Sequence, residues 1–206
     1  MTVSLVIVGI NGWEEYTRPM LNSIWMHEPD ADVLVVDNAS DTPYPLADHI
    51  LRLPERVSYA AALNEGAKRV TGEWILTLNN DIRCEGKFIS EIERLEKDAI
   101  YGRQIIEESG HTWLGNWLAL MEKVTYWIVG EWDANFKACG FEDADYCVRA
   151  AALGIPTKPV ELPFKHLWGK TRWAIPGYEH TREENITYFE KKHGWRPGRS
   201  MAVTHD

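Results

Sequence analysis

The stretch Trp74-Ile75-Leu76-Thr77-Leu78-Asn79-Asn80-Asp81 is the most informative part of this chain, because a mostly apolar run ends abruptly in three polar residues. A short run of this kind is typical of a strand that helices cover on both faces in a parallel sheet. In an open parallel sheet, ligands lie in the crevice beyond the carboxyl ends of the strands. The stretch therefore predicts an α/β fold with a binding site at one rim of the sheet.

Two earlier segments repeat this pattern of an apolar strand followed by a polar loop. Val3 to Val8 runs into Gly9-Ile10-Asn11-Gly12, and Asp32 to Val36 runs into Asp37-Asn38-Ala39-Ser40. Further elements are predicted from spacing and composition: helices over Trp13 to about Met26 and over Tyr59 to Val70, and a short strand over His49 to Leu53. Strands that alternate with helices imply right-handed βαβ units. We therefore expect a mainly parallel, Rossmann-like sheet whose three polar loops converge on one acidic rim.

A second acidic group opens a predicted helix between Gly140 and Gly154, after a shorter predicted helix over Phe88 to Leu95. Successive residues of a helix are about 100° apart, so Asp143 lies on the same side of this helix as the apolar residues of the following turns, which are Tyr146, Cys147 and Ala150. We expect this carboxylate to point inward, with Glu142, Asp145 and Arg149 on the other side and an Asp145–Arg149 pair. A carboxylate over an apolar stripe at a helix start is a plausible general base. A plain N-terminal cap is the alternative.

One basic stretch, Phe164 to Arg172, stands out in an otherwise acidic chain. It contains His166 and Lys170, where a phosphate opposite the acidic rim could meet positive charge. A structural, hydrogen-bonded histidine is the alternative interpretation of His166.

Length and composition indicate one domain. The 206 residues are 45% hydrophobic, which suffices for a single core, and we expect this domain to cover residues 1–195. Residues 196–206 form a polar tail with the composition of a disordered end. The formal net charge of -9 argues against bulk affinity for nucleic acid, because phosphate contacts need excess Lys and Arg.

The location is predicted from what the sequence lacks. Three cysteines without metal-finger spacing suggest reduced thiols rather than a disulfide framework or a zinc site. The apolar start lacks the positive flank of a signal peptide, and no run of about 18 apolar residues predicts a transmembrane segment. We expect a cytoplasmic protein, with peripheral attachment to a membrane left to a partner.

Several motifs together resemble, in order and spacing, the inverting family 2 glycosyltransferases of GT-A fold. They are Val3 to Asn11, Val35 to Ser40, Ala62 to Ala67, Leu78 to Asp81, Trp132 to Phe136, Gly140 to Asp145, and His166. The resemblance implies a nucleotide-sugar half over about residues 1–100 and an acceptor half over about residues 101–195. It implies metal-dependent transfer of a sugar from a nucleoside-diphosphate sugar to a hydroxyl of a glycan, a lipid-linked sugar, a protein or another acceptor.

The resemblance also implies roles for individual residues. Asp81 and His166 would hold Mn²⁺ or Mg²⁺, the imidazole favouring Mn²⁺, and Asp143 would take the proton of the acceptor hydroxyl. Asp37 would accept a hydrogen bond from the nucleobase, and Asn11 would line the base and the ribose. The other implied substrate contacts are Asn38, Asn64, Asn79, Asn80, Trp132, Asp133, Glu142 and Lys170.

The chain departs from the family pattern at the metal motif, where Asn79-Asn80 precede the single carboxylate of Asp81. Metal affinity would then rest on one carboxylate and His166. Two alternatives stay open. One is a sugar nucleotidyltransferase, although the loop Gly9 to Trp13 has no basic residue for a triphosphate. The other is a binding module of the same fold that has lost turnover.

Overall fold

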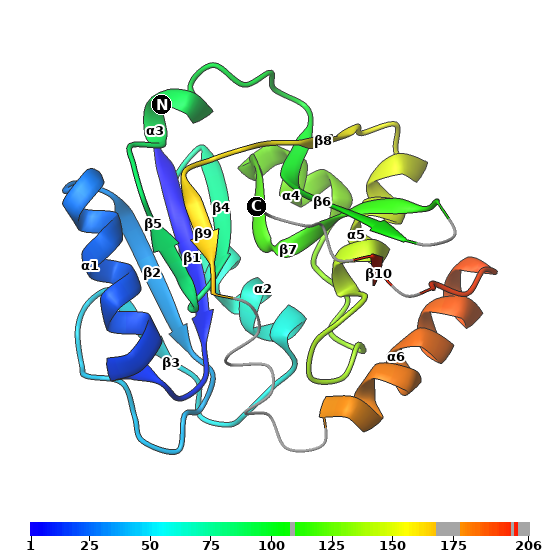
Figure 1. Ribbon diagram of the computed structural model, residues 1–206, viewed down its shortest axis with the longest axis horizontal. Helices are drawn as coiled ribbons and strands as arrows, with labels where there is room; N and C mark the ends of the chain where they lie inside the picture. The colour runs from blue at the N-terminus through cyan, green and yellow to red at the C-terminus, as the bar shows by residue number, and fades with distance from the viewer. Residues whose placement is uncertain (108–109, 168–177, 199, 202–206) are drawn as a thin grey trace.

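Four parallel strands form one half of the central sheet, as the sequence predicted. They are β1 (Val3–Gly9), β2 (Asp32–Asp37), β3 (Ile50–Arg52) and β4 (Trp74–Asn79), with β1 between β2 and β4. In this computed structural model, which describes residues 1–107, 110–167, 178–198 and 200–201, β1 and β2 point the same way (Figure 1). Their carboxyl ends therefore share one edge of the sheet.

The other half of the sheet is largely antiparallel. Its strands are β6 (Ile100–Glu107), β7 (Thr112–Glu122), β8 (Thr157–Pro159) and β10 (Ser200–Met201). The full order is β10-β6-β7-β4-β1-β2-β3, and β8 adds to β6 in parallel. A separate antiparallel pair joins β5 (Ile82–Cys84) to β9 (Phe164–His166). The long strand β7 lies antiparallel to β4 and so returns toward the opposite end of the sheet.

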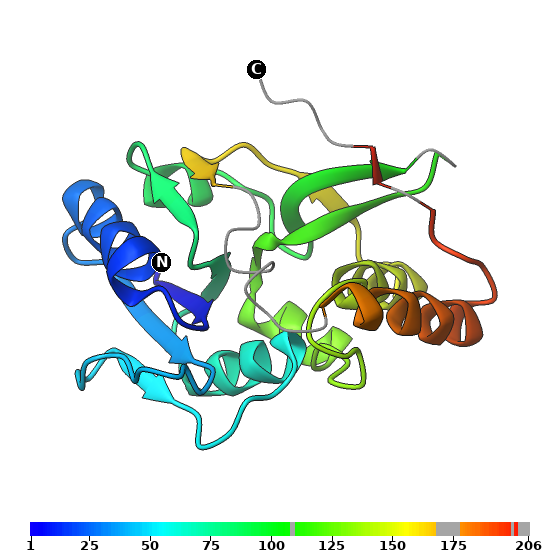
Figure 2. The same cartoon turned by 60° about the horizontal axis from the view of Figure 1, so that its bottom comes forward.

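Helices cover both faces of the sheet, as Figures 1 and 2 show. The helical elements are the π-helical turn η1 (Trp13–Thr17), α1 (Arg18–His27), α2 (Tyr59–Arg69), α3 (Ile89–Ile92), α4 (Lys123–Val129), α5 (Glu142–Ala152) and α6 (Tyr178–His193). One core cluster joins α1 and α3 to one face, and the other joins α2, α4, α5 and α6 to the opposite face. Among the described residues, none of the helices has the length and apolar character needed to cross a bilayer.

The strand β1 shows why both faces must be covered. Its side chains alternate, so that Leu5 and Ile7 belong to the α1 core while Val6 and Val8 belong to the α2 core. Leu5, Val6 and Ile7 are fully buried. Burying an aliphatic side chain of this size contributes roughly 1.5–3 kcal/mol. The apolar run of β1 therefore fits only a strand enclosed by helices on each side.

One predicted helix is shorter in the structure. The helix expected over Phe88 to Leu95 is the single turn α3, since the chain departs after Ile92 toward β6. The polar tail is described only in part: Arg196 pairs with Glu190, and β10 adds to β6. Residues 199 and 202–206 of that tail lie outside the described residues.

Candidate functional site

The three polar loops predicted from the sequence do meet at one rim. In the sheet register, Gly9 pairs with Asp37 and Val8 with Asn79, so the ends of β1, β2 and β4 are direct neighbours. The backbone N–H of Asn38 also donates to the carbonyl of Gly9 over 2.9 Å. The parallel topology alone thus gathers Asn11, Asp37 and the Asn79-Asn80-Asp81 stretch.

Asp81 and His166 form a buried polar pair at this rim. The Oδ1 atom of Asp81 lies 3.1 Å from Nε2 of His166, and both side chains are almost wholly buried. The pairing of β5 with β9 places them together, because Ile82 is opposite His166 and the Leu167 N–H donates to the Asp81 carbonyl over 2.9 Å. Trp117 of β7 stacks on the imidazole, with ring centroids 4.9 Å apart and an interplanar angle of 3°. The ring plane of His166 is therefore fixed from one side.

The carboxylate and the imidazole make a direct hydrogen-bond contact, and its length also suits two neighbouring ligands of one divalent cation. Two ligand bonds of about 2.1 Å at a right angle separate their donor atoms by about 3.0 Å, close to the 3.1 Å between Asp81 and His166. Within the described part of the chain, no group of three or more His, Cys, Asp or Glu side chains could hold a metal by itself. The residues thus fit a metal only if other ligands complete its coordination.

The two asparagines before Asp81 face different neighbours. Asn79 accepts a hydrogen bond from the Tyr59 hydroxyl over 2.8 Å, and its Nδ2 lies 3.4 Å from His166 Nε2. Asn80 is buried, and its Nδ2 donates to Thr17 Oγ1 over 3.0 Å. Asn79 is therefore part of the rim, whereas Asn80 anchors the metal motif to the start of α1.

Asp37 is engaged by its own loop. Its carboxylate accepts from the backbone N–H groups of Ser40 (2.9 Å) and Tyr44 (3.1 Å) and pairs with Arg52 at 2.5 Å. The Asp37 side chain is fully buried. These bonds shape the loop after β2 and use three of the roughly four lone-pair sites of the carboxylate.

Asn11 and Asn38 also hold this loop. The side chain of Asn11 exchanges two hydrogen bonds with Asp41, of 3.0 Å to its carboxylate and 2.8 Å from its N–H. Asn11 itself has a φ of 57°, a left-handed conformation that asparagine tolerates better than most residues. Asn38 exchanges two bonds of 2.9 Å with the backbone of Val57. The side-chain amide of Asn38 is thus used within the protein, while Asn11 stays at the accessible edge.

The start of α5 brings the second acidic group to the same region. Asp143 is half-buried and accepts a hydrogen bond from the Ala144 N–H over 2.9 Å. The hydroxyl of Tyr59 is close enough to the acidic residues at the rim and at the start of α5 for their charges to affect its pKa. Burial raises the Tyr59 pKa well above its usual value, and the charges of Glu142, Asp81 and Asp143 contribute. The tyrosine stays protonated and lies between the rim and the start of α5.

The predicted orientation of α5 was wrong in part. Tyr146, Cys147 and Ala150 are buried as expected, but Glu142 and Asp145 are buried too. Asp145 does pair with Arg149 at 2.9 Å, and it also meets Lys192 and His193 of α6. The physical reason is that α6 covers the side of α5 that a helical projection leaves to solvent. Asp143 is consequently the most accessible carboxylate in the first turn that could meet a substrate.

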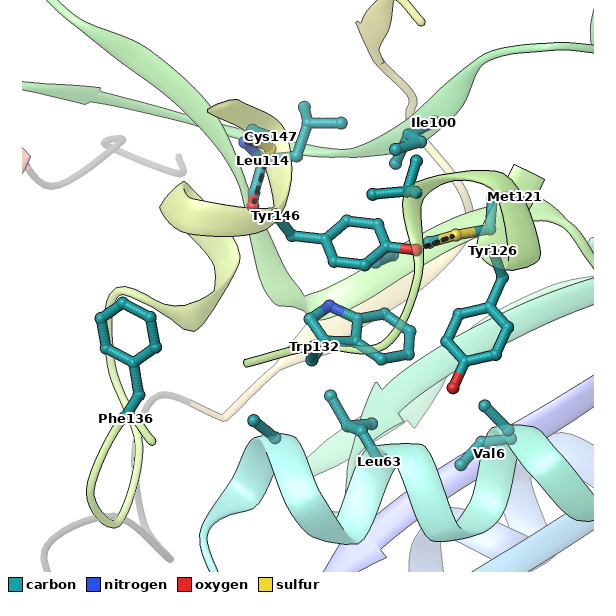
Figure 3. Packing of buried hydrophobic residues seen from close by; sticks show 14 of the residues in the cluster. Val6, Leu63, Ile100, Leu114, Met121, Tyr126, Trp132, Phe136, Tyr146 and Cys147 are labelled. Carbon is teal, nitrogen blue, oxygen red and sulfur yellow. Dashed lines mark hydrogen bonds between the residues drawn. The ribbon is translucent and has the colours of Figure 1, made fainter. Parts of the chain in front are cut away.

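Trp132 is a core residue rather than part of an open surface. It stacks on Tyr146 with centroids 4.7 Å apart, and Figure 3 shows it between Tyr146 and Leu63 of α2. Asn64 holds its backbone through two hydrogen bonds, of 2.8 Å to the carbonyl and 2.9 Å from the N–H. Asn64 and Trp132 therefore tie α2 to the loop that leads into α5.

Asp133 lies in a charged network with α6. Its carboxylate accepts from Lys192 at 2.6 Å and from the Tyr188 hydroxyl at 2.9 Å, and Asn135 caps it as well. Burial alone would raise the pKa of Asp133, but these bonds outweigh it and hold the pKa well below the usual range. The network fixes the position of α6 against the loop before α5.

The remaining predicted residue, Lys170, lies outside the described residues. Sequence reasoning missed Tyr59, Trp117 and Arg52. Tyr59 could have been found as the first residue after a serine N-cap, Ser58, because the start of a helix that follows a rim loop faces the rim. Nothing in the local sequence pattern places Trp117 beside a residue 49 positions further along the chain.

Comparison with known proteins gives a family match over most of the chain. The model of the family described as Glycosyl transferase family 2 matches residues 4–150. A search of the curated proteins finds no match.

Several solved structures share the fold at low sequence identity. A mannosyltransferase from Pyrobaculum calidifontis, in complex with GDP-Man and Mn²⁺, has a TM-score of 0.68 and 16% identity; the match covers 95% of this chain and 65% of that one. GalNAc-T7 with UDP, GalNAc and Mn²⁺ has a TM-score of 0.65 and 14% identity, over 80% and 43% of the two chains. S. aureus TarS 1-349 with UDP has a TM-score of 0.61 and 12% identity, over 95% and 72%. These likenesses establish the GT-A fold, and the chain spans less than two thirds of the first two proteins.

Proposed function

We propose that this chain, which belongs to glycosyl transferase family 2, moves a sugar from a nucleoside-diphosphate sugar to the hydroxyl of an acceptor. The observation that carries the proposal is the Asp81–His166 pair, 3.1 Å apart at the rim where the three loops meet. Asp143 lies at the start of α5, and its charge acts on the Tyr59 hydroxyl, which donates a hydrogen bond to Asn79 at that rim. One cleft edge would thus hold both a diphosphate and a base.

On the donor side, we infer that Asp81 and His166 would hold a divalent cation together with the diphosphate of the donor. An imidazole ligand favours Mn²⁺ over Mg²⁺, and two structural neighbours contain Mn²⁺. When bound, the cation would offset the charge of the departing nucleoside diphosphate. Asp37, whose carboxylate is fully buried, would shape the loop that receives the nucleobase, and Asn11 would line the base and the ribose.

On the acceptor side, Asp143 would take the proton of the attacking hydroxyl. The Ala144 N–H and the first turn of α5 stabilise its ionised form, since a helix start favours negative charge. A hydroxyl that attacks the anomeric carbon from the side opposite the diphosphate inverts its configuration. No enzymic nucleophile is needed for this single displacement.

The test uses donor binding and turnover separately. We would screen UDP, GDP and dTDP by thermal unfolding, each with and without Mn²⁺, and then assay the corresponding sugar donors with glycan, lipid-linked and protein acceptors. Asp143→Asn should lower kcat by about 100-fold or more with little change in donor affinity, as expected for loss of a general base. Asp81→Ala should weaken Mn²⁺-dependent donor binding as well. Full transfer by either variant would refute the assignment, and NMR of the product reports inversion.

The small number of protein ligands available for a metal favours a second function. With one carboxylate and one imidazole, a binding module that retains nucleotide without turnover is chemically reasonable. That function predicts nucleotide binding that Asp81→Ala weakens, no donor consumption with any acceptor, and no effect of Asp143→Asn.

A further inference from the structure

Tyr59 occupies the junction between the donor and acceptor sides of the proposed site. It is the first residue of α2, and its backbone N–H donates to the Ala138 carbonyl over 2.7 Å, which fixes the helix start against the loop before α5. Its hydroxyl reaches the opposite way and donates to Asn79 Oδ1 over 2.8 Å. The side chain thus spans from one side of the site to the other.

This hydrogen bond determines which end of the Asn79 amide faces the rim. Because Oδ1 is held by Tyr59, Nδ2 is turned toward His166 Nε2, 3.4 Å away. In the opposite amide orientation, the tyrosine hydroxyl would have to donate to the Asn116 carbonyl, a longer contact of 3.4 Å. The observed orientation therefore presents an N–H donor to the rim instead of a carbonyl oxygen.

A donor at this position suits both groups that the proposed reaction brings there. The Asp81 carboxylate, 3.1 Å from the same Nε2, favours a proton on that nitrogen when no cation is bound. The Asn79 N–H opposes this and favours the histidine tautomer that keeps a lone pair on Nε2, the form that binds a metal. The same N–H attracts a phosphate oxygen, which a carbonyl oxygen would repel. The stack on Trp117 keeps the His166 ring from turning away. The Asn79 N–H therefore influences the tautomer of a ring whose orientation is fixed.

We propose that Tyr59 is a positioning residue that orients the Asn79 amide and thereby prepares His166 for a divalent cation. This inference rests on the proposed function, because it concerns the same metal and diphosphate. Tyr59 itself touches neither the metal nor the reacting atoms.

The experiment measures Mn²⁺ binding directly, from the electron paramagnetic resonance signal of the free ion, in the presence of UDP, GDP and dTDP in turn. The proteins are the wild type, Tyr59→Phe, Asn79→Ala, the double variant, and Tyr126→Phe. Tyr126→Phe is the matched control, because the Tyr126 hydroxyl is buried and makes no hydrogen bond within the described residues. Circular dichroism checks that each variant is folded.

Tyr59→Phe should weaken Mn²⁺ binding about 10-fold, the lower end of the effect of losing an outer partner of a metal ligand. Asn79→Ala should show a similar loss, and the double variant should bind no more weakly than Asn79→Ala alone, because the hydroxyl acts through the amide. Tyr126→Phe should match the wild type.

Wild-type affinity in Tyr59→Phe, or losses that add in full in the double variant, would overturn the role of Tyr59. If the wild type takes up no Mn²⁺ with any of the three nucleotides, the proposed function fails first and this inference fails with it.

Discussion

Gly66 of α2 offers a test of how tightly the helix that carries Tyr59 is seated on the sheet. A methyl group added there would lie 2.4 Å from Val6 Cγ1 and 3.0 Å from Val36 Cγ2. In an open helix, Gly→Ala stabilises by about 1 kcal/mol. Here Val6 is fully buried on a central strand and has no room to retreat. We take the overpacking cost from the upper part of its range, about 2–3 kcal/mol.

The net expectation for Gly66→Ala is a loss of about 1–2 kcal/mol, since the packing cost exceeds the helix gain. For a chain of this size, that lowers Tm by about 2–8 °C in calorimetry. Adding Val6→Ala removes the closest contact of the new methyl group. The loss of unfolding free energy in the double variant should therefore be smaller than the sum of the two single losses by at least about 0.5 kcal/mol. A Tm at or above that of the wild type in Gly66→Ala would refute the reasoning, because the helix would then have room to move outward.

Other predictions concern the polar contacts that shape the site. Arg52→Ala leaves the buried Asp37 carboxylate with only its two backbone donors. Because the arginine is partly exposed, we expect the free energy of unfolding in urea to fall by about 1–2 kcal/mol, less than the full cost of breaking a buried ion pair. A fall of less than about 0.5 kcal/mol would contradict this prediction. Asn64→Ala leaves the buried backbone N–H and carbonyl of Trp132 without their hydrogen-bond partners and should lower the free energy of unfolding in urea by about 2–4 kcal/mol. An unchanged unfolding midpoint would mean that water replaces the Asn64 amide. The low pKa of Asp133 implies a stability contribution that is present above its unfolded value of about 3.9 and lost as pH falls through the folded value. Lys192→Met removes one cause of that low pKa, so its stability deficit against the wild type should be largest near pH 7 and shrink toward pH 2; a deficit that is constant over this range would sink the explanation.

The rim was predictable because it follows from topology. The end of each apolar run marks a carboxyl end of a strand, and parallel strands place all such ends on one edge. The opposite directions of the Asn79 and Asn80 side chains could also have been predicted from the sequence, since successive residues near a strand end face opposite sides of the sheet. Both were expected among the substrate contacts at the rim, and only Asn79 faces His166 there, whereas Asn80 bonds to Thr17.

The second half of the site was harder to predict because its partners come from distant segments. A helical projection gives the angle between Asp143 and Asp145 but not which side another helix will cover. Here Lys192 and His193 of α6 meet Asp145 and bury it. Likewise, the stack that fixes His166 depends on the antiparallel return of β7, which apolar periodicity did not reveal.

The proposed metal site has a consequence for the order in which ligands bind. In the proposed site Asp81 and His166 would supply two protein ligands, and the described residues contain no third acidic, cysteine or histidine side chain in the group. A Mn²⁺ ion prefers a larger set, and in the proposed reaction the diphosphate of the donor would supply part of it. Metal and nucleotide then stabilise each other's binding, and by linkage each must strengthen the other by the same factor. We therefore expect Mn²⁺ alone to raise Tm little and a nucleoside diphosphate alone to raise it little, whereas the two together raise it by more than the sum. Equal shifts with Mn²⁺ alone and with the pair would show that the protein completes the metal site without the donor.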